Sequence, residues 1–200
     1  MMIELIQKLD MPYRETIFQA GQYYHIYNRG NNRQNIFFER ENYLFFLRSL
    51  RRYLLAETLD IIAYCLMPNH YHLLVCLKTA DLSAAMQAFS LSYTKAMNRR
   101  YDRVGSLFQG RFQAILVDRT EYLLNLSRYI HWNPVKAGLV KQPQDWEFSS
   151  FHEYVGLRGG TLPKTEDILA ILGSEDACHS YMRMEMDTIS SGLRGLLLDK

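Results

Sequence analysis

Two histidines separated by a single residue, His70 and His72, have the spacing of a metal-ligand pair. Residues two apart on a β-strand project to the same face of a sheet, so both imidazoles can converge on one ion. The apolar residues 73–75 that follow indicate that the pair begins a strand of the core. Histidine pairs at this spacing are more often surface or packing residues, so the pair alone does not establish a metal site.

A second pair, Tyr129 and Asn133, is four residues apart in a stretch whose pattern predicts a helix. Residues at this spacing lie on one helix face, one turn from each other. A tyrosine hydroxyl can act as a nucleophile, and an amide oxygen is a suitable ligand for a hard cation. The alternative is structural: Tyr129 is one of 14 tyrosines, and Asn133 could simply end the helix before Pro134.

Hydrophobic periodicity predicts the elements that must position these residues. Strands are expected at residues 23–27, 59–66, 70–77 and 112–117, with one helix after the first strand and another over residues 82–97. Asp118, followed three residues later by Glu121, resembles a capping box for a further helix that runs to about Trp132, where Pro134 ends or bends it. This order predicts an α+β, ferredoxin-like fold: an antiparallel sheet with helices on one face, plus the extra helix.

The chain length of 200 residues fits one domain with an appended tail. We assign residues 1–155 to the main domain and residues 156–200 to a C-terminal helical extension, because the glycine-rich residues 156–160 loosen the chain. Short helices are expected to start near Thr165 and Ser174.

Composition and charge narrow the class of protein. The net charge is only +2, but residues 95–119 hold six basic residues against two acidic ones, which indicates a polyanionic partner. The three cysteines follow no metal-ligand spacing and are interpreted as reduced thiols. The sequence shows neither an apolar run of membrane-span length nor a signal-peptide core, so a cytoplasmic protein without membrane contact is expected.

Together, residues 67–75 (MPNHYHLLV) and 128–140 (RYIHWNPVKAGLV) resemble the IS200-like transposase family, whose members carry an HUH motif and a single catalytic tyrosine. Within that family the sequence is most similar to the REP-associated tyrosine transposases. The resemblance begins near Gly21, includes residues 105–112 and ends at residues 146–150. It covers about two thirds of the chain, in order, and is more specific than either short motif.

The resemblance implies a role for each motif residue. His70 and His72 would be metal ligands, with Tyr71 as an unusually bulky and polar middle residue, and Tyr129 would be the nucleophile on the extra, catalytic helix. Asn133 would be the third ligand, where many relatives have a glutamine that is longer by one methylene. The implied cofactor is Mg²⁺ or Mn²⁺, which would polarise the scissile phosphate.

The implied activity is transposase chemistry on single-stranded DNA, at hairpin-forming repeats of the REP type, through a 5′-phosphotyrosine intermediate. IS200-like relatives commonly act as dimers, whereas repeat-associated relatives can act alone, so a homodimer and a monomer both stay open. Polar and basic residues expected to bind DNA are Asn28, Arg29, Arg33, Lys95, Arg99, Arg100, Arg111 and Lys136. The alternative for these residues is a solvated basic face.

Other residues and functions compete with this interpretation. Tyr93 and Tyr101 are rival nucleophiles, and the histidines outside the motif, including His25 and His131, are interpreted as structural or surface residues. A domesticated protein that binds hairpin DNA without moving it is the main alternative function. An RNA-binding ferredoxin-like module would carry a Lys/Arg-Gly-Phe-type signature, which the sequence lacks.

Overall fold

The computed structural model describes residues 17–184 and contains a four-stranded antiparallel sheet. Its strands are β1 (Tyr23–Arg29), β2 (Leu59–Met67), β3 (His70–Leu77) and β4 (Gln113–Val117). They lie in the order β2-β3-β1-β4, so β1 and β3 occupy the centre of the sheet. The predicted α+β fold with an antiparallel sheet is therefore confirmed.

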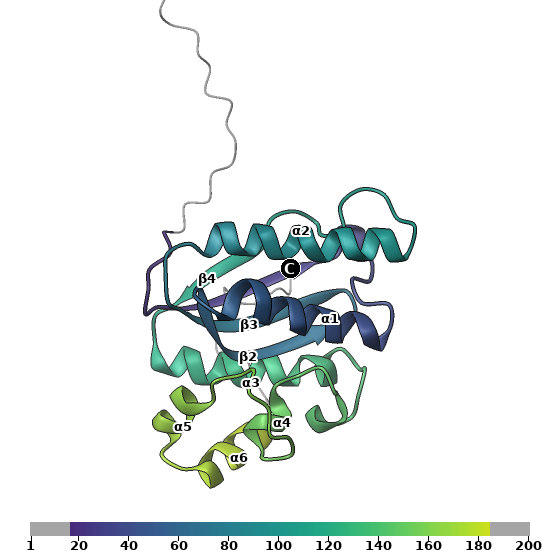
Figure 1. Ribbon diagram of the computed structural model, residues 1–200. Coiled ribbons are helices and arrows are strands. Elements are labelled where there is room, and N and C mark those ends of the chain that lie inside the picture. The colour runs from purple at the N-terminus through teal and green to yellow at the C-terminus, as the bar shows by residue number, and fades with distance from the viewer. Residues whose placement is uncertain (1–16, 185–200) are drawn as a thin grey trace, which may run out of the picture.

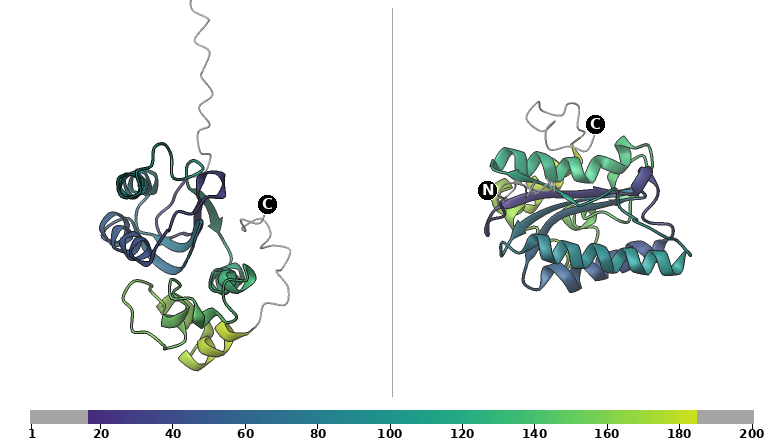
Figure 2. Two further views of the ribbon diagram at one scale, coloured as in Figure 1. Left: turned by 90° about the vertical axis from the view of Figure 1, so that its right-hand side faces the viewer. Right: turned by 90° about the horizontal axis from the view of Figure 1, so that it is seen from above.

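Helices cover both faces of the sheet. On one face lie α1 (Arg40–Leu50) and α2 (Leu82–Arg100), and on the opposite face lies α3 (Thr120–Lys136) (Figures 1 and 2). The shorter helical segments are η1 (Asn31–Arg33), η2 (Arg51–Leu55), η3 (Pro143–Asp145), α4 (Phe151–Tyr154), α5 (Glu166–Leu172) and α6 (Glu175–Arg183). The extra helix expected from the sequence is α3.

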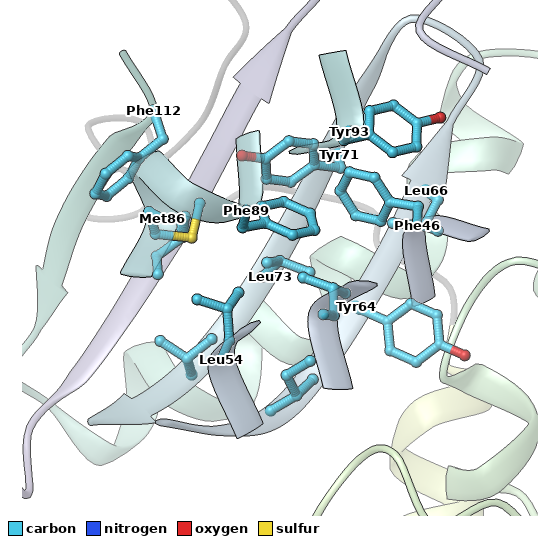
Figure 3. Packing of buried hydrophobic residues seen from close by; sticks show 14 of the residues in the cluster. Phe46, Leu54, Tyr64, Leu66, Tyr71, Leu73, Met86, Phe89, Tyr93 and Phe112 are labelled. Atoms are coloured by element: carbon cyan, nitrogen blue, oxygen red, sulfur yellow. The ribbon is translucent and has the colours of Figure 1, made fainter. Parts of the chain in front are cut away.

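Strand alternation divides the core into two clusters, one on each face of the sheet. Tyr71 and Leu73 of β3 point toward α1 and α2, where the ring centroid of Tyr71 is 5.1 Å from that of Phe46 (Figure 3). Leu74 belongs to the cluster on the α3 face. The bulk of Tyr71 therefore fills the core on the face opposite His72, which explains why a large residue fits between the two histidines.

The helix α3 continues through Pro134 to Lys136, whereas the sequence predicted a helix to about Trp132 that Pro134 ends or bends. Proline removes one intrahelical hydrogen bond, but the last turn forms because the backbone N–H of Ala137 donates to the carbonyl of Asn133 at 2.9 Å. Asn133 consequently stays helical, one turn after Tyr129. The expected capping box was also wrong, since the N-cap is Arg119 rather than Asp118 and it makes no side-chain cap bond.

The segment of residues 156–184 packs on the α3 side of the sheet (Figure 1). Its helices α5 and α6 begin directly after Thr165 and Ser174, as predicted, and the Ser174 hydroxyl accepts a hydrogen bond from the backbone N–H of Ala177. The indole N–H of Trp132 on α3 donates to the carbonyl of Met182 at 3.1 Å. The domain boundary after residue 155 remains a prediction.

Arg158 joins the start of this segment to β2 and to the residues around α4. Its guanidinium donates to both carboxylate oxygens of Glu153 at 2.8 Å, to the carbonyl of Ser149 at 2.7 Å and to the hydroxyl of Tyr64 at 3.2 Å. The Glu153 side chain is only 7% exposed, whereas that of Arg158 is 36% exposed. Removing the arginine therefore leaves a nearly buried carboxylate without its counter-charge.

We expect Arg158→Leu to lower the free energy of unfolding by about 2 kcal/mol, a buried-pair value reduced because the arginine is partly exposed. Urea unfolding at neutral pH measures this change. The control is Arg40→Leu, which breaks a solvent-exposed pair with Glu147 and should leave the urea midpoint nearly unchanged. Equal urea midpoints for the two variants would contradict the role of Arg158 as the counter-charge of the nearly buried Glu153.

Within residues 17–184, no helix is long and apolar enough to cross a membrane. All three cysteines, Cys65, Cys76 and Cys178, are free thiols, as their number and spacing predicted.

Candidate metal and nucleophile site

The strand β3 presents both histidines of the motif on the sheet face that α3 covers. In the antiparallel register with β1, His70 pairs with Arg29 and His72 pairs with Tyr27. The ring centroids of His70 and His72 are 5.0 Å apart, and their planes are nearly perpendicular, at 89°. The two imidazoles are thus close enough to bind one cation, as the strand spacing predicted.

His72 is completely buried. Its Nδ1 lies 3.0 Å from Nε2 of His25, while its Nε2 has no hydrogen-bond partner among the residues that the structure describes. Burial lowers the pKa of His72 well below its ordinary value, and the charges of His25 and His70 lower it further. His72 is therefore neutral at physiological pH, which is the form of imidazole that binds a metal.

His70 is half-buried, and its Nδ1 lies 2.6 Å from the side-chain oxygen of Asn69. The amide nitrogen of Asn69 donates to the carbonyl of Arg33, which directs the amide oxygen toward His70. An amide oxygen accepts hydrogen bonds only, so Nδ1 of His70 carries the proton and the ring lone pair lies on Nε2. This tautomer suits a metal ligand.

Tyr129 reaches the same place from α3. Its side chain is buried, and its ring meets that of His72 edge-on, with centroids 6.1 Å apart at 85°. The nucleophile predicted from the helix and a histidine predicted from the strand are therefore direct neighbours within one chain.

Two further residues share the helix face of Tyr129, four and seven positions later. The amide nitrogen of Asn133 donates to the carbonyl of Tyr129 at 3.0 Å, which leaves the amide oxygen as the atom that can approach a cation. The ammonium nitrogen of Lys136 lies 4.5 Å from the centroid of the Tyr129 ring. Lys136, expected to bind DNA, thus places a positive charge beside the phenol.

The donor set fits a divalent cation. Two imidazole nitrogens and one amide oxygen suit Mn²⁺ as well as Mg²⁺. In the described part of the chain no three His, Cys, Asp or Glu residues gather into a metal-binding group, and Asn133 is the residue that the sequence predicted as the third ligand. The buried Nε2 of His72 supports the fit, because a buried polar atom without a partner is costly unless a ligand satisfies it.

Of the residues expected to bind DNA, several lie near this site. Arg29 is next to His70 in the sheet, and its guanidinium donates to the side chain of Gln109. Arg33 is exposed in η1 beside Asn69, and Arg111 is exposed just before β4.

The other candidates lie elsewhere or already have partners. Lys95, Arg99 and Arg100 are on α2, across the sheet from the histidine pair, and Arg100 forms an ion pair with Glu39 at 2.5 Å. The side chain of Asn28 is buried, where it donates to the carbonyl of Gly110 and accepts from the backbone N–H of Arg29. The local basic excess in the sequence is thus divided between two faces.

Two residues of β1 that were not predicted from the sequence as part of the site also lie against His72. These are His25, which contacts its ring nitrogen, and Tyr27, whose ring centroid is 6.2 Å away. Burial raises the pKa of Tyr27, although the charge of Arg29 opposes the rise, so its phenolate is disfavoured. Strand alternation in residues 23–27 places both on one face, but no sequence pattern indicates that their side chains meet those of β3.

The two tyrosines considered as rivals lie elsewhere. Tyr93 belongs to α2 and packs in the core on the opposite face of the sheet, where its hydroxyl donates to the carbonyl of Ile36. The hydroxyl of Tyr101 contacts Glu39 and Asn42 on the same side of the sheet.

His131 is structural, as expected. It is fully buried, its Nε2 lies 2.8 Å from the hydroxyl of Ser150, and burial together with the charge of His152 lowers its pKa to about 3. In the unfolded chain the ordinary value is 6.5. Protonation therefore favours the unfolded state, and the contribution of His131 to stability falls as the pH drops below about 6.5.

At about pH 5 the protonation of His131 in the unfolded chain should lower the free energy of unfolding by roughly 2 kcal/mol. Each unit of pKa difference between the folded and unfolded states corresponds to about 1.4 kcal/mol. Urea unfolding at pH 7 and pH 5 should show a smaller acid loss for His131→Gln than for the wild type, whatever the absolute stability of the variant. If both proteins lost the same stability between pH 7 and pH 5, His131 would not have the lowered pKa that its burial implies.

Comparisons with known proteins identify the family of the chain. The family model for IS200-like transposases matches residues 18–133. A putative REP-associated tyrosine transposase of Haemophilus influenzae is 34% identical over 107 residues, which make up 48% of this chain and 61% of that protein. The REP-associated tyrosine transposase of Escherichia coli is 26% identical over 145 residues, or 72% of this chain and 84% of that protein.

A solved structure of a REP-associated tyrosine transposase bound to a REP hairpin has the same fold, with a TM-score of 0.59 and 23% identity, over 76% of this chain and 96% of that one. The family match extends over more than half of the 200 residues and ends at Asn133. It thus contains the histidine pair and Tyr129, and the chain belongs to the IS200-like transposase family.

Proposed function

We propose that the protein is a metal-dependent tyrosine transposase that cuts and rejoins single-stranded DNA at hairpin-forming repeats. The observation that best supports this function is the edge-on contact between Tyr129 and His72, at 6.1 Å between ring centroids. This contact brings a candidate nucleophile next to a buried imidazole whose Nε2 has no partner in the described part of the chain.

The proposed ligands of the cation are His70, His72 and the amide oxygen of Asn133. A bound Mg²⁺ or Mn²⁺ would polarise the scissile phosphate and neutralise part of its charge. The three side chains come from two adjacent rigid elements, β3 and α3, which suits a site that must hold its geometry.

In the proposed reaction, the phenol oxygen of Tyr129 forms a bond to phosphorus while the bond from phosphorus to the 3′ oxygen breaks. The phenol loses its proton, and the departing 3′ oxygen gains one and becomes a hydroxyl. The product is a 5′-phosphotyrosine, which retains the bond energy for rejoining. Lys136, 4.5 Å from the ring centre, favours negative charge on the phenol oxygen as it attacks.

The proposed substrate is a hairpin with a single-stranded flank. The structural neighbour is described as bound to a REP hairpin. Arg29, Arg33 and Arg111 lie at the end of the sheet where His70 begins β3, and they would bind phosphates near the site. Lys95, Arg99 and Arg100 would contact DNA that passes the α2 side, and binding would weaken as salt rises.

One chain supplies both the histidines and the tyrosine of the proposed site. This supports a monomer that can cut DNA without a partner's helix, and a dimer is not required by the geometry. A DNA substrate is consistent with the cytoplasmic location expected from the sequence, which stays a prediction.

A covalent-adduct assay tests the function. Purified protein is incubated with labelled hairpin DNA and Mn²⁺ and is then run on a denaturing gel, beside a reaction with EDTA and one with an unstructured strand of equal length. We expect a protein–DNA adduct with the hairpin and Mn²⁺ only. Hairpin binding without any adduct would favour the alternative function, a hairpin-binding protein that does not move DNA.

A further inference from the structure

The contact between His25 and His72 joins the two central strands of the sheet beneath α3. His25 is not the direct register partner of His72 but its diagonal neighbour, because Tyr27 pairs with His72 and His25 pairs with Leu74. Diagonal side chains on one face are within reach of each other when they are long or aromatic. The two rings lie nearly parallel, at 15°, with centroids 5.2 Å apart.

The 3.0 Å contact between Nε2 of His25 and Nδ1 of His72 can form in two ways, since one of the two nitrogens must carry the hydrogen. If His25 donates, the neutral His72 ring has its own hydrogen on Nε2, where the described residues offer no acceptor and no metal can bind. If His72 donates from Nδ1, its Nε2 presents a lone pair. Only the second arrangement makes His72 a metal ligand.

We propose that His25 is a positioning residue that accepts the Nδ1 hydrogen of His72 and thereby fixes the tautomer and ring orientation in which Nε2 can hold the cation. The inference rests on the proposed metal site and adds to it a residue that touches neither metal nor substrate.

The surroundings of His25 suit this role. Both histidines are fully buried, so water has no access to replace the acceptor. The ring of Tyr27 packs against His25 at 5.0 Å between centroids, which holds the imidazole in place. Partners of this kind fix the orientation of ligating histidines, and their loss weakens metal affinity about 10- to 100-fold.

The test measures Mn²⁺ affinity by electron paramagnetic resonance in the absence of DNA. We expect His25→Leu, which removes the acceptor and keeps an apolar core residue, to weaken Mn²⁺ binding about 10- to 100-fold. His25→Gln retains an oxygen that can accept from Nδ1 and should stay within about threefold of the wild type. His131→Gln, a change at another fully buried histidine, serves as the control and should bind Mn²⁺ like the wild type.

Thermal unfolding of each variant separates loss of the site from loss of the fold. A second readout uses ¹⁵N-histidine NMR of the wild type with Mg²⁺, where we expect His72 to be protonated at Nδ1. A folded His25→Leu variant with wild-type affinity, or a His72 ring protonated at Nε2 with the cation bound, would overturn the inference and leave the metal site intact. If the His70→Ala and His72→Ala variants both bound Mn²⁺ as tightly as the wild type, the proposed metal site itself would be overturned.

Discussion

The Tyr129→Phe variant should form no covalent DNA adduct, a loss of at least about a thousandfold, while its affinity for hairpin DNA changes by less than about threefold. The substitution removes only the hydroxyl. The ring that packs edge-on against His72 and beneath the Lys136 ammonium is retained, so the helix and its contacts should persist. The denaturing-gel assay measures the adduct, and a filter-binding titration at fixed salt measures the affinity.

Tyr27→Phe is the matched control, since Tyr27 lies about as far from His72 as Tyr129 does, at 6.2 Å between ring centroids. Its raised pKa disfavours the phenolate, so this variant should still form the adduct. An adduct that survives in Tyr129→Phe and disappears in Tyr27→Phe would show that the nucleophile is Tyr27 on β1.

The second large effect is expected at the histidine pair. His72→Ala should weaken Mn²⁺ binding about a hundredfold or more and abolish the adduct, because it removes a buried, neutral imidazole from the proposed ligand set. His70→Ala should act in the same direction. Hairpin affinity should be retained in both variants, because neither removes a positive charge from the protein surface.

Metal affinity is measured by Mn²⁺ titration, with His131→Gln as the control for the loss of a buried histidine. Unchanged Mn²⁺ affinity in both His70→Ala and His72→Ala would refute the assignment of the metal site. A loss of adduct without any loss of metal affinity would show instead that the histidines act on the DNA directly.

The sequence by itself determined the strands, which motif residues share one face of their own element, and the family. Alternation along β3 is a local property, so His70 and His72 had to share one face and Tyr71 had to occupy the other. The spacing of Tyr129 and Asn133 likewise fixed their common helix face, once Pro134 proved compatible with the last turn of α3.

Tertiary packing alone decided which faces meet. The helix α3 crosses the sheet on the side of the histidines, which brings Tyr129 to His72 over 57 positions of sequence separation that no periodicity encodes. The same packing placed His25 against the ring nitrogen of His72 and left the basic residues of α2 on the opposite face. Local patterns specify to which face of a helix or strand each side chain points. Which faces then contact each other is set by how the elements bury their apolar surfaces together.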